Sequence, residues 1–333
     1  MRKTLTLMAV LLCMGSSYVS AQQNPMFTKY MFNSLVFNPA YAGSRDFMSI
    51  NLLHRTQWWG IPGGPQTQSF SIHSPLANER VGVGLSAVND VIGPTRSMQA
   101  FLSYAYRIPI GKGKLSIGIQ GGAMNWRADW SEVDLQDTGD DAFSEVDPSY
   151  WLPNFGAGIY YYTRSFYVGF SSPQLIEYDL REDNINTAQW ARQYRHYFFT
   201  AGAAIPVAGD NVVFRPSLLV KNVGLLSSFN KDEAYQGIGA PTEFDIDVSL
   251  FFYQTLWVGA SFRSAVEGVV GDSSSFDSID IWAAYYLANG LRIGAAYDYT
   301  LTELQTAAKG SFEIMLGYEF DYRTNKAVTP RYF

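Results

Sequence analysis

Histidines and cysteines are the first side chains to examine for chemistry, because they commonly serve as metal ligands, bases and nucleophiles. The three histidines, His54, His73 and His196, lack ligand-type neighbours at metal-binding spacing, and Cys13 is the only cysteine. No nucleophile elbow, phosphate loop or catalytic carboxylate pair appears. The acidic stretch 134–141 does not match the calcium-loop spacing, so we interpret it as a solvated loop. We therefore expect no metal, no cofactor and no enzymatic activity.

One further group of carboxylates has a regular spacing. Glu243, Asp245 and Asp247 alternate with apolar residues and therefore share one face of a predicted strand. That face either attracts cations into a lumen or is neutralised by Arg215 and Lys221, which the preceding antiparallel strand brings to the same face. We favour neutralisation, because unpaired carboxylates in a confined space are unfavourable.

The same alternation recurs along the chain and predicts the elements that carry these residues. In 244–252, 291–299 and 312–320, apolar residues occupy one face, and the charged residues that occur lie on the other. Charges on one face of a strand need a wet lumen on that side. Several glycines also fall on the inward face, where we expect them to relieve crowding at curved positions: Gly82, Gly84, Gly118, Gly156, Gly158 and Gly259.

Short and long connections alternate between these segments, which is typical of a bacterial membrane barrel. A soluble sandwich also has many strands, but nothing in it forces the long loops onto one end. An even number of strands places both termini in the periplasm. We predict an all-β fold, a transmembrane antiparallel β-barrel of about 14 strands: 48–53, 67–75, 80–89, 97–107, 114–126, 154–163, 166–172, 195–206, 212–221, 243–252, 256–263, 277–287, 291–299 and 310–320.

The start of the chain has the pattern of a secretory signal. Basic residues, an apolar stretch and a small-residue site before Gln22 predict a signal peptide over 1–21. Cys13 lies within it, so the mature chain would have no thiol. Only 16% of the residues are charged and 16% are aromatic, which suits strands facing lipid. The net charge of -6 argues against nucleic acid as a partner. The predicted location is the outer membrane.

Residues 22–47 precede the barrel, which we assign to 48–333. Asn24 followed by Pro25 is a helix-start signal, and apolar residues then follow at helical spacing. We predict a short helix from Pro25 to Leu35, followed by irregular chain. A segment so rich in Phe and Tyr is expected to pack into or against the periplasmic mouth and partly occlude the lumen.

Two ordered motifs give this chain a specific resemblance. Residues 23–33 have the pattern Q-x-P-x-F-x-x-Y-M-F-N, and residues 38–43 read N-P-A-Y-A-G. Residues 55–58 have the pattern R-x-Q-W, and the chain ends with 330–333, P-R-Y-F. In these features the whole sequence resembles the PorP/SprF family. Asn24 departs from the acidic residue frequent in that family, although both residue types cap helices.

The resemblance implies an outer-membrane component of the type IX secretion system of the Bacteroidetes. Such proteins support secretion or surface attachment of cargo with a C-terminal sorting domain, and in some members gliding. The expected partners are that cargo, other type IX components on the periplasmic side and outer-membrane lipid. The candidate partner-contact residues are those of the motifs: Pro25, Phe27, Tyr30, Met31, Phe32, Asn33, Asn38, Pro39, Tyr41, Gly43, Arg55, Gln57 and Trp58.

The alternative is an outer-membrane diffusion channel or substrate-specific porin. A channel would have a sparsely filled lumen with a charged constriction, whereas a cargo anchor would have an occluded lumen and aromatic loops. Several aromatics fall in segments that we predict to be long loops, and they favour the anchor: Trp58, Trp59, Trp126, Trp130, Tyr150 and Trp151.

Overall fold

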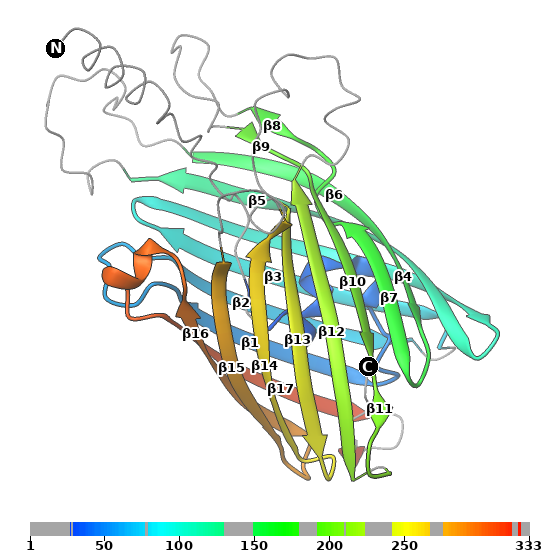
Figure 1. The fold of residues 1–333 in the computed structure, drawn as a ribbon. Coiled ribbons are helices and arrows are strands. Elements are labelled where there is room, and N and C mark those ends of the chain that lie inside the picture. The colour runs from blue at the N-terminus through cyan, green and yellow to red at the C-terminus, as the bar shows by residue number, and fades with distance from the viewer. Residues whose placement is uncertain are drawn as a thin grey trace, which may run out of the picture.

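The structure is a computed structural model that describes residues 27, 29–76, 79–129, 149–179, 192–209, 211–223, 242–266, 276–321 and 326–327. Its main feature is a closed antiparallel barrel (Figure 1). The barrel closes because β1 (Met48–Thr56) pairs with β17 (Ser311–Asp321) in register from Met48↔Phe320 to Thr56↔Phe312. Closure removes the unpaired strand edges that lipid cannot solvate.

Fourteen strands make up the barrel, and each pairs with its neighbours along the chain. Besides β1 and β17 they are β2 (Gln66–Pro75), β3 (Val81–Ile92), β4 (Thr95–Ile110), β5 (Gly113–Ala128), β6 (Ser149–Tyr162), β7 (Phe166–Ser172), β10 (His196–Ala203), β12 (Val212–Val223), β13 (Glu243–Phe252), β14 (Leu256–Ala265), β15 (Phe276–Tyr286) and β16 (Leu291–Thr300).

Four two-residue strands lie beside this barrel. β11 (Ile205–Pro206) pairs with β12, and β18 (Lys326–Ala327) pairs with β17. β8 (Tyr178–Asp179) and β9 (Arg192–Gln193) form a separate two-stranded sheet. None of the helices in the described part of the chain has the length and apolar character to cross a membrane.

The predicted fold is confirmed: all fourteen predicted segments correspond to barrel strands. The largest differences are in length. β4 and β5 extend until only residues 93–94 separate β3 from β4 and only 111–112 separate β4 from β5. β6 begins at Ser149 rather than near 154. Hydrogen bonding to the neighbouring strand extends each of these strands into residues with weak alternation of apolar and polar side chains. The sequence pattern therefore predicts strands that are shorter than the observed ones.

The connections define the two ends of the barrel. At the end that we call the turn end, 76–80, 111–112, 163–165, 253–255 and 287–290 join successive strands. At the opposite end, the loop end, the connections include 57–65, 129–148, 173–195, 224–242 and 301–310. The alternation is not complete, because the loop-end link between β3 and β4 is also short.

The two faces of each strand differ as the alternation predicts. On β13, Asp245, Asp247 and Ser249 are at most 3% exposed, whereas Ile246 and Val248 are 45% and 46% exposed. Polar side chains therefore point into the barrel, and apolar side chains cover its outside. The core of this protein is the barrel interior, so the functional groups to examine are those that meet inside it.

The N-terminal segment differs from the predicted helix. Its described residues form three short turns of helix, η1 (Tyr30–Phe32), α2 (Ser34–Phe37) and η2 (Pro39–Tyr41). A helix from Pro25 to Leu35 is thus wrong for its described part, and Pro25 lies outside that part. Asn33 has φ −135° and ψ 44°, which interrupts the helix, and its amide group donates to Ser69 Oγ at 2.7 Å. The Asn33 N–H keeps a local bond to the Tyr30 carbonyl at 3.1 Å, so the side-chain contact with the wall is added to these short turns.

Candidate functional site: the occupied lumen

The described residues between Phe27 and Phe47, which we call the lumen segment, fill the inside of the barrel. Near its beginning, the Phe27 carbonyl accepts a hydrogen bond from Arg263 Nη2 at 3.1 Å, close to the loop end of β14. Near its end, the Gly43 carbonyl accepts a hydrogen bond from Arg107, close to the turn end of β4. The segment thus runs along the lumen, rather than only covering a mouth, and then continues into β1.

Lys29 provides the most deeply buried charge of the segment. Its Nζ lies 3.5 Å from Asp247 Oδ2 and 3.9 Å from Asp280 Oδ2, and all three side chains are fully buried. The same ammonium donates to Ser261 Oγ and lies 5.4 Å from the ring centroid of Trp282. A cation in this position offsets part of the cost of burying two carboxylates.

The carboxylates of β13 are paired, although not entirely as predicted. Lys221 Nζ lies 3.6 Å from Glu243 Oε2, in agreement with neutralisation by β12. Asp245 instead pairs with Arg263 at 2.8 Å, and Asp247 with Lys29. Two of the three cations that pair with these carboxylates therefore come from elsewhere: Arg263 from β14 and Lys29 from the lumen segment. Neither was predicted from the sequence.

Arg215 was also predicted to neutralise the β13 carboxylates. It points into the barrel and is 7% exposed. Its guanidinium carbon lies 3.8 Å from the ring centroid of Trp257 and 5.9 Å from that of Phe251. Stacking of this kind stabilises a desolvated guanidinium. Arg215 therefore has the predicted face, and its guanidinium stacks on aromatic rings of β13 and β14.

Arg55, from the R-x-Q-W motif, is connected to the lumen segment through Glu313. Arg55 Nη2 lies 2.6 Å from Asp298 Oδ2, and Nη1 lies 3.5 Å from Glu313 Oε2. The other oxygen of Glu313 accepts a hydrogen bond from the backbone N–H of Lys29 at 3.1 Å. The two sequence motifs therefore meet at one carboxylate on β17.

Aromatic rings fill the middle of the lumen. Phe32 packs at centroid distances of 4.9 Å from Trp257 and 5.4 Å from Trp282, and the Arg292 guanidinium lies 4.5 Å from its ring. Phe37 packs on Phe198 at 5.2 Å. Such contacts are worth about 0.5–1.5 kcal/mol each beyond the area they bury. These contacts attach the lumen segment to the wall at β10, β14, β15 and β16.

Tyr30 adds a polar contact to this aromatic layer. Its hydroxyl donates to Ser217 Oγ at 2.8 Å. The lumen segment is therefore hydrogen-bonded to β12 as well as packed on aromatic rings.

Ionic contacts also hold the segment at the turn end. Arg45 Nη2 lies 3.8 Å from Glu319 Oε1, and Arg45 Nε donates to Tyr41 Oη at 3.1 Å. Asp46 Oδ1 lies 3.3 Å from Arg107 Nη1 and 3.1 Å from Lys114 Nζ. The segment is thus attached by charges at both ends and by aromatic packing between them.

Three of the inward glycines, Gly82, Gly118 and Gly158, face the lumen segment. A Cβ at Gly82 would overlap the carbonyl of Ala42, and one at Gly118 would overlap the backbone of Ala40. Gly158 similarly faces the Asn38 side chain, whose Nδ2 donates to the Ile159 carbonyl at 3.0 Å. These glycines make room for the lumen segment itself. The sequence signal was present, since glycines recur on the inward faces of neighbouring strands.

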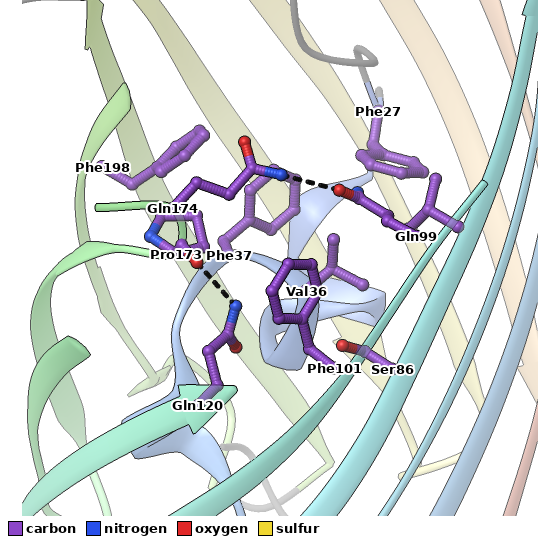
Figure 2. A pocket seen from close by; sticks show the side chains of 11 residues that line it. Phe27, Val36, Phe37, Ser86, Gln99, Phe101, Gln120, Pro173, Gln174 and Phe198 are labelled. Atoms are coloured by element: carbon purple, nitrogen blue, oxygen red, sulfur yellow. Dashed lines mark hydrogen bonds between the residues drawn. The ribbon is translucent and has the colours of Figure 1, made fainter. Parts of the chain in front are cut away.

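One cavity of about 30 Å³ remains beside the segment, with room for about two water molecules. Figure 2 shows it between the rings of Phe27, Phe37 and Phe198 and three glutamines. Gln174 donates to Gln99 Oε1 at 2.8 Å, and Gln120 donates to the Pro173 carbonyl at 2.9 Å. This cavity is too small for a substrate.

Most of the motif residues proposed as partner contacts lie inside the barrel. The buried ones are Phe27, Tyr30, Phe32, Asn33, Asn38, Pro39, Tyr41, Gly43 and Arg55, while Met31, Gln57 and Trp58 are half-buried. Pro25 lies outside the described residues. The structure also assembles lumen charges that sequence reasoning did not single out: Lys29, Arg263, Asp280, Asp298 and Glu313. For the four residues other than Lys29, inward parity on a strand was the available signal.

The aromatics assigned to long loops need a correction. Trp126 belongs to β5, and Tyr150 and Trp151 belong to β6, because these strands extend beyond the predicted ends. Trp58 and Trp59 do lie in a connection, where Trp59 is 53% exposed and packs on Phe312 at 5.2 Å. Trp130 and the acidic stretch 134–141 lie outside the described residues.

In the described ranges, no group of three or more His, Cys, Asp or Glu side chains is arranged to hold a metal ion. His73 and His196 are buried in the barrel wall, and His73 Nδ1 accepts a hydrogen bond from the Gly43 N–H at 3.2 Å. That contact gives His73 a structural role beside the lumen segment.

The chain matches one protein family along most of its length. The family described as type IX secretion system membrane protein PorP/SprF matches residues 19–318. The Acinetobacter baumannii outer membrane protein Omp33 aligns with a TM-score of 0.44 and 9% identity over 83% of this chain and 100% of that chain. The CymD monoaromatic hydrocarbon channel aligns with a TM-score of 0.47 and 10% identity over 89% of this chain and 94% of that chain. No curated protein sequence matches.

Proposed function

Because the chain belongs to the PorP/SprF family of type IX secretion system membrane proteins, we propose that it supports the secretion or surface anchoring of cargo with a C-terminal sorting domain. The family and the fold identify the protein as an outer-membrane barrel of this secretion system. The proposed role is non-enzymatic and uses no cofactor. Residues 1–21 act as the signal peptide, and the cargo is of the adhesin type.

The observation that carries this proposal is the occupied lumen. A diffusion channel needs a continuous aqueous path, whereas here the described residues from Phe27 to Phe47 pack against the barrel wall. Buried ion pairs at Lys29 and Arg45 hold this segment in addition to aromatic contacts. Removing one partner of a buried pair costs about 3–5 kcal/mol, so the segment resists displacement by thermal motion alone. This supports an anchor over an open channel.

The proposal includes an orientation. The turn end faces the periplasm and the other secretion components, and the long connections face the outside, as in bacterial membrane barrels. The last barrel strand, β17, then ends on the periplasmic side, whereas Phe27, which contacts Arg263 near the loop end, places the described start of the lumen segment toward the outside. In this orientation the lumen segment enters β1 at the side of the secretion machinery, so the motif residues are in position to respond to a periplasmic partner.

A reversible covalent bond between the segment and the wall tests the role of the segment. A Cβ added at Gly158 would lie 3.0 Å from Asn38 Cγ, the position that the sulfur of Asn38→Cys takes, so the pair Asn38→Cys and Gly158→Cys is suitably placed for a disulfide. Cys13 lies in the predicted signal, so no other thiol interferes in the mature chain. Cells carrying this variant are assayed for surface cargo and, after purification, for conductance in planar bilayers, each with and without reductant.

If the segment must move during cargo handling, the oxidised variant loses surface cargo and the reduced variant recovers it. Each single cysteine variant serves as the matched control and retains cargo under both conditions. A complementary variant lacks residues 22–43 and should conduct ions once its barrel assembly has been verified. Unchanged surface cargo in both the fixed and the deleted variant would remove the segment from the function.

A further inference from the structure

Two arginines stand opposite each other on the outer face of the barrel. Arg96 of β4 and Arg127 of β5 are Cα partners in the ladder, and both are exposed. Directly opposite residues have Cβ atoms about 5 Å apart, and like charges there repel. Neither arginine forms an ion pair or hydrogen bond with a residue of the described ranges. The two arginines thus place two positive charges close together on the outer surface of the barrel.

This pair lies at the border of an uncharged surface. The outward positions of β4 from Met98 to Ile110 and of β5 from Gly113 to Asn125 carry no charged residue. At ~3.4 Å per residue and a tilt of about 40°, the stretch from Met98 to Ile110 covers about 30 Å of membrane thickness. The hydrocarbon core of a bilayer is about 30 Å thick. The two guanidinium groups therefore stand at the level of the lipid headgroups at the loop end.

The surroundings of the pair are amphipathic. On the next outward row, Met98 faces Asn125, and Asn125 faces Trp151 of β6. Met98 and Trp151 are 60% and 74% exposed, which is far more than a side chain packed within the protein. Tryptophan concentrates at the boundary between headgroups and acyl chains. A lipid here would meet apolar side chains along its chains and two guanidinium groups at its head.

We propose that Arg96 and Arg127 together bind a phosphate group of a membrane lipid. Guanidinium groups are well suited to this chemistry, because their planar N–H forks match phosphate oxygens in pairs. One phosphate between the two arginines cancels their mutual repulsion. In the orientation proposed above, on which this assignment of leaflet rests, the loop-end leaflet is the outer one and its phosphate-bearing lipid is lipid A.

Native mass spectrometry of the purified full chain, released from detergent in the presence of lipid, measures this binding. The probes are bisphosphorylated lipid A, dephosphorylated lipid A, phosphatidylglycerol and inorganic phosphate. The test variant is Arg96→Gln with Arg127→Gln. Its matched control is Lys112→Gln with Arg164→Gln, which removes two exposed charges from the turn end. Heat-dependent gel mobility verifies that both barrels are folded.

The expected result is that the test variant loses affinity for lipid A by about tenfold or more, whereas the control variant retains it. Dephosphorylated lipid A should bind the native chain as weakly as lipid A binds the test variant. Phosphatidylglycerol binding that also depends on the two arginines supports the site while extending it to other phospholipids. Retained lipid A binding in the test variant, an equal loss in the control, or competition by millimolar inorganic phosphate would overturn the proposal.

These measurements use no cargo and no secretion machinery. A failure of lipid binding is therefore distinguishable from a failure of the proposed secretion role. If the arginines instead serve the acidic connection 130–148, their replacement will leave lipid A binding unchanged, and that result also counts against the site.

Discussion

The Nζ atom of Lys29 lies 3.5 Å from a carboxylate oxygen of Asp247, although the two residues are 218 positions apart in the chain. This contact joins the N-terminal family motif to the alternating carboxylates of β13. It also explains how three inward-facing acidic residues on one strand are tolerated, since the cation for Asp247 comes from outside the sheet. The lumen segment and the barrel wall are therefore complementary in charge.

The first prediction concerns Lys29→Met. Removing the ammonium leaves Asp247 and Asp280 without this cation, and losing one partner of a buried pair costs about 3–5 kcal/mol. We expect the lumen segment to detach while the barrel remains closed. The measurement is maleimide labelling of a reporter Ser34→Cys in the folded protein, which should become much faster. Lys112→Met, at an exposed turn, is the control, and an unchanged labelling rate in Lys29→Met would contradict the role of this pair.

A second prediction compares the stabilisation that two ion pairs of β13 provide. Asp245 and Arg263 are buried and 2.8 Å apart, whereas the Glu243 side chain that faces Lys221 is 21% exposed. Asp245→Asn should therefore destabilise the barrel by about 3 kcal/mol or more, and Glu243→Gln by less than about 1 kcal/mol. Urea unfolding of the refolded barrel in lipid vesicles measures both. Equal effects from the two substitutions would show that burial does not set the strength of these pairs.

The third prediction tests the space between a wall strand and the lumen segment. A side chain at Gly118 would overlap the backbone of Pro39 and Ala40, so Gly118→Val should displace η2 from the wall. The matched control is Gly121→Ala on the same strand, where an added Cβ would make only an ordinary contact with Phe155. We expect Gly118→Val to raise conductance in planar bilayers and Gly121→Ala to leave it unchanged. Low conductance in a correctly folded Gly118→Val barrel would mean that the segment adapts.

The fourth prediction concerns orientation. Cysteines introduced at Gly139 and Gly237, in two loop-end connections, should react with an impermeant maleimide on intact cells. A cysteine at Lys112, in the turn between β4 and β5, should react only after lysis. Lys112 is preferable to its neighbour Gly111, because Gly111 has φ +59° and a side chain there would be strained. Labelling of Lys112→Cys on intact cells would reverse the proposed orientation.

The sequence alone determined the barrel. Period-2 alternation sets which face of each strand is apolar, and a one-residue slip would reverse both faces, so the pattern on β13 or β16 has only one register compatible with lipid outside. The strand ends were less determined, as in β4 and β6, because a ladder continues wherever its neighbour offers a partner. The sequence motifs by themselves also indicate the family.

Only the tertiary structure decided what the inward face contacts. The pattern showed that Asp245, Asp247 and Glu313 point inward, but their partners, Arg263, Lys29 and Arg55, lie 18, 218 and 258 positions away in the chain. The helix predicted for the N-terminal segment failed for the same reason: the Lys29 backbone N–H donates to Glu313 of the wall, and the Asn33 backbone leaves helical geometry where its side chain donates to Ser69. Side-chain periodicity records which way a residue faces, whereas closure of the barrel around its own N-terminal segment decides what it meets there.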